Sequence, residues 1–85
     1  MFFTYILKSK KDSKLYIGYA RDLKKRFKEH NSGLVESTRS RKPFSLVYYE
    51  SYVSKQDAVK CENNLKLRAK ALTQLLKRIS NSIKA

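Results

Sequence analysis

The sequence predicts an α+β fold in which a small three-stranded antiparallel sheet is flanked by helices. Three segments rich in aromatic and β-branched residues, at 2–8, 14–19 and 44–53, have the composition of strands. Stretches with helical spacing of apolar residues lie between and after them. The resulting order, β-β-α-β-α-α, is typical of a sheet layer packed against helices. With 85 residues, the chain is expected to form a single domain over residues 1–85.

The first half of the chain is predicted to contain a β-hairpin and one helix. The hairpin is indicated by the polar residues 10–13, which separate the first two strand segments. The helix is predicted to begin after Asp22, a good N-cap residue, and to end at residues 31–33, which include Gly33. Residues 34–43 show little apolar periodicity and are expected to form a very basic loop.

The second half is predicted to be helical after the third strand. Ser54 and Asp57 have the spacing of a capping box, and the apolar side of the helix that follows consists of Ala58, Cys61 and Leu65. A further apolar stripe continues to the C-terminus and consists of Ala69, Leu72, Leu76, Ile79 and Ile83. This basic tail is expected to be a core helix with a solvated face, and a helix lying on a membrane surface is the alternative.

The charge of the chain indicates a polyanionic partner. Lys and Arg number 20 against 7 Asp and Glu, so the formal net charge is +13. Nucleic acid is the expected partner, with an anionic membrane and the ribosome as alternatives that use the same physics. The residues expected to contact nucleic acid are Lys25, Thr38, Arg39, Arg41, Lys42 and Lys66.

The single cysteine, Cys61, excludes an intramolecular disulfide and favours a reducing compartment. No apolar run approaches the length of a membrane span, so no membrane insertion is expected. The opening segment is too short and wrongly flanked for a signal peptide. The cytoplasm is therefore the expected location.

Five polar residues do not fit a purely structural interpretation. Arg26 and His30 share a helix face with apolar residues, and Glu62 borders the apolar side of the next helix. Ordinary explanations exist, since Arg26 can extend to solvent, His30 can cap its helix and Glu62 can pair with Lys66. The hydroxyls of Tyr5 and Tyr16 are expected to emerge at one edge of the sheet near Arg26.

The same residues narrow the possible chemistry. No Ser-His-Asp set is expected from the one histidine, there is no Gly-rich phosphate loop, and no Cys/His cluster could hold zinc. Tyrosines, an arginine, a histidine and a carboxylate in a basic domain suit phosphodiester hydrolysis better than other reactions.

Several of these residues form a pattern that resembles the GIY-YIG endonuclease family. Phe3-Thr4-Tyr5 is followed by Tyr16-Ile17-Gly18, Arg26 lies ten positions after Tyr16, and Glu62 falls on a later helix. The chain is most similar to the short, single-domain, excinuclease-C-subunit-like subgroup, in residues 16–19, 23–30, 46–50 and 61–66. It departs from the first motif, where Phe3-Thr4 replaces Gly-Ile, but it keeps the tyrosine.

The resemblance implies metal-dependent hydrolysis of phosphodiester bonds in DNA, in a repair or recombination setting, with one divalent cation, Mg²⁺ or Mn²⁺. By analogy, Glu62 is the metal ligand, and Arg26 steadies the scissile phosphate. Tyr5 and Tyr16 activate or orient the attacking water, with His30 assisting. The alternative is a module that binds DNA or RNA with weak or no turnover.

Overall fold

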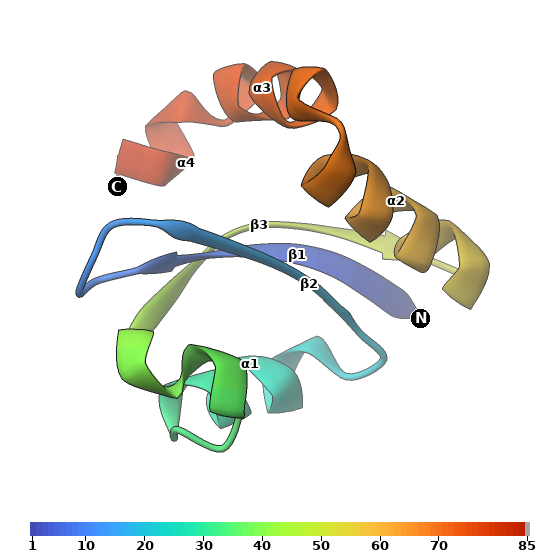
Figure 1. Ribbon diagram of the computed structural model, residues 1–85. Helices are drawn as coiled ribbons and strands as arrows, with labels where there is room; N and C mark the ends of the chain where they lie inside the picture. Colours follow the sequence, from blue (N-terminus) through green and yellow to red (C-terminus); the bar gives the residue numbers. More distant parts are fainter. Residues whose placement is uncertain (85) are drawn as a thin grey trace.

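A three-stranded antiparallel sheet with strand order β2-β1-β3 forms the centre of the protein. The computed structural model describes residues 1–84. Helix α1 and the short 3₁₀ helix η1 lie on one face of the sheet, and helices α2, α3 and α4 lie on the other (Figure 1). The elements are β1 (Phe2–Ser9), β2 (Leu15–Ala20), α1 (Leu23–Asn31), η1 (Glu36–Arg41), β3 (Phe44–Tyr52), α2 (Lys55–Leu67), α3 (Ala69–Arg78) and α4 (Ser80–Lys84). The predicted α+β fold is confirmed.

The central strand β1 divides the core into two halves, because its side chains alternate between the two covered faces. Ile6 packs with Ile17 of β2 beneath α2 and α3, where Leu65 and Leu75 complete the cluster. Tyr5 and Leu7 point to the other face, where Phe44, Leu23 and Phe27 surround them. The face with Tyr5 is the one that carries the candidate site.

Helix α1 begins and ends as predicted. The Asp22 carboxylate caps its start by accepting a hydrogen bond from the backbone N–H of Lys25 at 3.0 Å. Gly33 follows the helix with φ +77°, a conformation that other residues rarely adopt. The cap and the turn together bring His30, in the last turn, underneath the sheet, where it is completely buried.

The structure corrects three local predictions. Residues 34–43 are not an irregular loop throughout, because η1 forms over six of them. Ser54 is the N-cap of α2, but among residues 1–84 its side chain makes no capping hydrogen bond, so the capping box does not form. The C-terminal helix is interrupted at Ile79. The backbone of Ile79 leaves the helical region, and its side chain packs against the core.

The C-terminal helices cover the sheet, as the core-helix interpretation predicts. The buried position of α3 is Leu75, flanked by Leu72 and Ile79, whereas Ala69 of the predicted stripe is exposed. The predicted stripe included Leu76, which is half-buried, and missed Leu75, the buried residue of α3. Lys8 of β1 donates to the carbonyl of Ile83 at 2.7 Å and ties α4 to the sheet. Within residues 1–84, no helix is both long and apolar enough to cross a membrane.

Candidate active site

His30 is the centre of a buried polar network that joins α1, β1 and η1. Its Nε2 lies 2.9 Å from the Tyr5 hydroxyl, and its Nδ1 lies 2.8 Å from the hydroxyl of Thr38. The side chains of Tyr5, His30 and Thr38 are all at most 1% exposed. The Tyr16 ring packs edge-on against the imidazole, with centroids 5.0 Å apart. Two tyrosines and the histidine are therefore in contact although they come from three different elements.

The two nitrogens of the His30 imidazole each face a hydroxyl, and a neutral ring donates through one nitrogen and accepts through the other. The Thr38 hydroxyl also lies 3.4 Å from the carbonyl of Val35. In the tautomer in which Thr38 donates to that carbonyl, its oxygen accepts from Nδ1–H of His30, and Nε2 carries no proton and accepts from the Tyr5 hydroxyl.

The electrostatics of the network keep both ionisable members neutral near pH 7. Burial raises the pKa of Tyr5 to about 12, and the neighbouring Arg26 guanidinium opposes part of this rise. Burial, followed by the charge of Arg26, lowers the pKa of His30. Both shifts oppose transfer of the phenolic proton to the imidazole, so the phenolate forms only where a further positive charge stabilises it.

Gly18 gives the Tyr5 hydroxyl its space. The two residues are direct partners across β1 and β2. A Cβ atom at position 18 would lie 2.6 Å from the Tyr5 hydroxyl oxygen and 3.1 Å from the Tyr16 ring. The glycine in the middle of a strand, which is otherwise unfavourable, is therefore explained by this close approach.

Arg26 lies at the solvent side of the network. Its side chain is 41% exposed and its guanidinium contacts Glu29 at 3.4 Å, a weak pair one turn away on the same helix. It borders a hollow of about 280 Å³ at the junction of β2 and α1, together with Tyr19, Arg21 and Lys25. Three cationic side chains thus line this depression, together with the carboxylates of Asp22 and Glu29.

Glu62 approaches the tyrosines from the opposite face of the sheet. It lies on α2, where its side chain is 15% exposed and pairs with Lys66 at 3.0 Å. The Lys66 ammonium lies 5.9 Å from the centre of the Tyr16 ring. The charge of Glu62 also contributes to the raised pKa of Tyr5. Within residues 1–84, however, Glu62 forms no hydrogen bond with Tyr5, Tyr16 or Arg26, and the expected pair with Lys66 is present.

Three expectations for the site residues are wrong. The Tyr5 hydroxyl does not emerge at a sheet edge, because β1 is the central strand. His30 does not cap α1 but is buried beneath the sheet. Thr38 is not available to nucleic acid, since η1 turns it inward onto His30. Its place in the network had no signal in the sequence, because the segment around it lacks periodicity.

The basic residues expected to contact nucleic acid divide into two groups. Lys25, Arg39, Lys42 and Lys66 are exposed. Arg41 is instead engaged within the protein, where it pairs with Asp12 at 3.0 Å, donates to the carbonyl of Leu15 and stacks on Phe44. Its guanidinium therefore supports the β1–β2 hairpin and is less available to a phosphate.

Comparison with known proteins agrees with the fold and identifies the family. The family described as the GIY-YIG catalytic domain matches residues 1–77. A UPF0213 protein of Staphylococcus saprophyticus is 43% identical over 65 residues, which cover 75% of this chain and 78% of that protein. A UPF0213 protein of Bacillus velezensis is 45% identical over 56 residues, 65% of this chain and 57% of that protein.

A solved structure of a UPF0213 protein has the same fold. The solution NMR structure of a UPF0213 protein from Bacillus halodurans is 38% identical, with a TM-score of 0.57, and the match covers 91% of this chain and 84% of that one. The family match spans the strands, α1 and α2, and so includes every residue of the network described above. The chain belongs to the GIY-YIG family, whose domain is in general a nuclease domain that binds nucleic acid.

Proposed function

We propose that this protein is a metal-dependent endonuclease that hydrolyses phosphodiester bonds in DNA, in a repair or recombination setting. The observation that carries the proposal is the 2.9 Å contact between the Tyr5 hydroxyl and Nε2 of His30, next to the Arg26 guanidinium. A tyrosine paired with a proton acceptor is a means of removing a proton from water, and a guanidinium beside it is a means of holding a phosphate.

In the proposed reaction, Tyr5 is the general base. It passes its phenolic proton to Nε2 of His30 and takes a proton from the attacking water. The water oxygen forms a bond to phosphorus, the bond from phosphorus to the leaving oxygen breaks, and the leaving oxygen takes a proton from solvent. The proton held by His30 then returns through Tyr5 to solvent, which restores both neutral groups. Tyr16, which packs on His30, orients the water. Thr38 holds the other imidazole nitrogen.

Arg26 is proposed to bind the scissile phosphate. Its planar guanidinium can donate two parallel hydrogen bonds to phosphate oxygens and does not lose its proton near neutral pH. The weak pair with Glu29 leaves it free to turn toward a phosphate. The same charge stabilises the Tyr5 phenolate, since Arg26 already lowers the pKa of Tyr5 relative to burial alone.

Glu62 is proposed to hold one Mg²⁺ or Mn²⁺. Within residues 1–84 no three His, Cys, Asp or Glu side chains gather into a cluster. This donor set nevertheless fits Mg²⁺, which prefers oxygen ligands and keeps several waters while taking others from substrate phosphate. Bound there, the cation supplies positive charge that stabilises the phosphate during displacement. Glu62 must first release Lys66, which is exposed and can then contact a phosphate.

The alternative is a DNA- or RNA-binding module with weak or no turnover. One observation favours it: the carboxylate proposed as metal ligand is occupied by Lys66 and reaches the tyrosines only indirectly. Under this alternative the exposed cations Lys25, Arg39, Lys42 and Lys66 bind the phosphate backbone, and no product forms.

A cleavage assay separates the two functions. Single-stranded, duplex and branched DNA and RNA are incubated with Mg²⁺ or Mn²⁺ and the wild type, Arg26→Ala or Glu62→Ala. We expect cleavage that falls about 10²- to 10³-fold on loss of Arg26, as for other groups that stabilise a transition-state charge. Glu36→Gln, an exposed acid on η1, is the control and should cleave normally. Full activity of folded Glu62→Ala would disprove the enzymatic proposal, and tight binding without any product would favour the alternative.

A further inference from the structure

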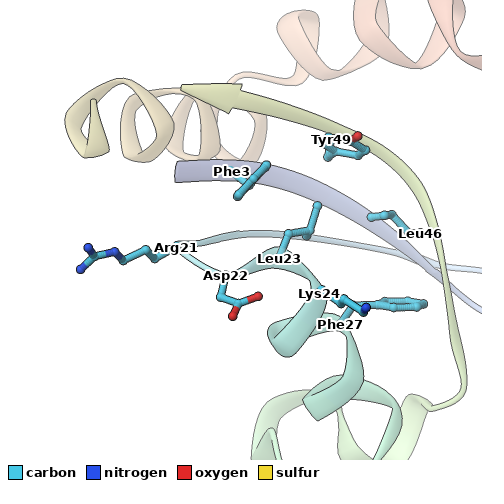
Figure 2. A pocket seen from close by; sticks show the side chains of 8 residues that line it. All are labelled: Phe3, Arg21, Asp22, Leu23, Lys24, Phe27, Leu46 and Tyr49. Carbon is cyan, nitrogen blue, oxygen red and sulfur yellow. The ribbon is translucent and has the colours of Figure 1, made fainter. Parts of the chain in front are cut away.

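An apolar groove of about 820 Å³ lies on the same face of the sheet as Tyr5, on the β3 side of α1. Figure 2 shows its walls: Phe3, Leu46 and Tyr49 come from the strands, and Leu23 and Phe27 face them from α1. This volume is within the range of about 300–1,000 Å³ that is usual for small-molecule sites. None of these residues takes part in the proposed reaction.

The groove depends on an irregularity in β3. Leu46 and Tyr49 are three positions apart and would point to opposite faces of a regular strand. The pairing of β1 with β3 shifts between Ile6 and Leu7, so that Leu46 opposes Leu7 while Tyr49 opposes Tyr5. This bulge places both side chains on the Tyr5 face. Tyr49 is 53% exposed, and its ring meets that of Phe3 edge-on at 6.0 Å.

The rim of the groove is cationic. Arg21 and Lys24 are both exposed. The one acid on the rim, Asp22, already accepts the capping hydrogen bond from Lys25. An aromatic surface edged by two cations is complementary to a nucleotide, which presents a flat ring and a phosphate. A purely apolar protein segment would leave those charges without a partner.

The groove is continuous with the hollow beside Arg26. Arg21 and Asp22 line both depressions, because they lie at the start of α1 between them. A strand whose phosphate contacts Arg26 can therefore pass over the start of α1 and present a neighbouring nucleotide to the groove. A base within an intact duplex is stacked and paired and has no free face to offer.

We propose that this groove binds one unpaired nucleobase of the substrate, stacked on Tyr49 and Phe3 next to the phosphate at Arg26. The inference rests on the proposed function for its ligand, and it adds a substrate class: nucleic acid that has an unpaired nucleotide beside the cleaved bond. Phosphate contacts cannot make this distinction, because they are the same in paired and unpaired strands.

The test measures binding without cleavage. Fluorescence anisotropy, in EDTA, compares the affinity for a short oligothymidylate with that for an abasic strand of the same length, which keeps the phosphates and lacks the bases. We expect the wild type to prefer the strand with bases about tenfold, as for one stacked base. Tyr49→Leu should remove this preference and leave the affinity for the abasic strand unchanged. Leu67→Ala, an exposed apolar residue at the end of α2, is the matched control.

Each outcome has one interpretation. An unchanged preference in Tyr49→Leu would overturn the inference, as would a Tyr49-dependent dimer in sedimentation, since a second copy would then be the occupant. Loss of the preference for bases in Tyr49→Leu supports the inference whether or not the protein cleaves nucleic acid. Conversely, normal cleavage with no base preference would leave the proposed function intact and contradict only the role of the groove. The two failures are therefore distinguishable.

Discussion

His30 is a buried imidazole whose two nitrogens both have partners in the neutral form. Protonation would make both ring nitrogens donors, so that neither could accept a hydrogen bond from Tyr5 or Thr38. Burial and the Arg26 charge also disfavour the imidazolium and lower the pKa of His30. The residue proposed to accept a proton during the reaction is therefore held in its unprotonated state by the resting protein.

This lowered pKa predicts a dependence of stability on pH. In the unfolded chain His30 binds a proton near its ordinary pKa of 6.5, whereas the folded protein resists that proton. Because the unfolded state then binds more protons, the free energy of unfolding should fall as the pH is lowered from 7 to 5. His30 is the only histidine, so the change isolates this residue. Urea denaturation at each pH measures it, and His30→Gln should flatten the profile; an equally steep decline in that variant would contradict the assignment.

Gly18→Ala tests the space above Tyr5. The added methyl group would stand 2.6 Å from the phenolic oxygen, so the ring must shift away from His30. We expect a loss of about 1–3 kcal/mol in unfolding free energy, as for an overpacked core, and a larger loss of cleavage. Gly33→Ala is not a suitable control because of its positive φ, so Ala20→Gly in the same strand is used. Wild-type cleavage by Gly18→Ala would show that the position of the Tyr5 ring against His30 is not needed for the reaction.

At the residue scale, the sequence was a better guide to the candidate side chains than to the contacts between them. Residue type and motif spacing singled out Tyr5, Arg26 and His30, because each is unusual on a core-facing position. Helical and strand periodicity predicts the face on which a side chain lies, but not which distant loop packs against it. The contact of Thr38 with His30 depends on the path of residues 32–38 back to the sheet, and no local pattern encodes that path.

Among the elements, α1 was the most predictable and the region after it the least. Asp22 and Gly33 define α1 through local chemistry, which a sequence displays directly. Helix η1 and the break at Ile79 are instead decided by contacts with the sheet. The bulge in β3 belongs to the same class, since it exists only in the pairing of β3 with β1. The apolar groove that it creates was accordingly not predicted.

Helix η1 carries two arginines with different expected roles, which a pair of variants separates. Arg41→Ala removes the pair with Asp12 and the packing on Phe44, so we expect a loss of about 1 kcal/mol in stability. Arg39→Ala alters an exposed side chain and should change stability by less than about 0.5 kcal/mol. Its effect should appear in DNA affinity, measured by anisotropy. The opposite assignment of effects would show that Arg41, and not Arg39, is the phosphate contact.

At the scale of the whole molecule, the sheet separates the proposed phosphate contact from the proposed metal ligand. Arg26 belongs to α1 and Glu62 to α2, and these helices lie on opposite faces of the sheet (Figure 1). Lys66, the partner of Glu62, lies 5.9 Å from the centre of the Tyr16 ring of β2. The sequence led to the prediction that these residues share a site, and that remains a prediction; the placement of the two helices on opposite faces was not predicted. A phosphate at the β2 edge would replace Glu62 as the partner of Lys66, which couples substrate binding to release of the carboxylate.

The formal net charge of +13 predicts that binding to nucleic acid is governed by salt. If Lys25, Arg26, Arg39, Lys42 and Lys66 each neutralise one phosphate, log K should fall with log salt at a slope near −4.5, from about −0.9 per contact with duplex DNA. Affinity should then drop roughly 500-fold between about 50 and 200 mM salt. Each Ala substitution in this set should reduce the slope by about one. Lys77→Ala, on α3 away from the site, should leave it unchanged. A slope near zero, measured by anisotropy with duplex DNA, would mean that these side chains do not contact phosphates and that the charge serves another partner.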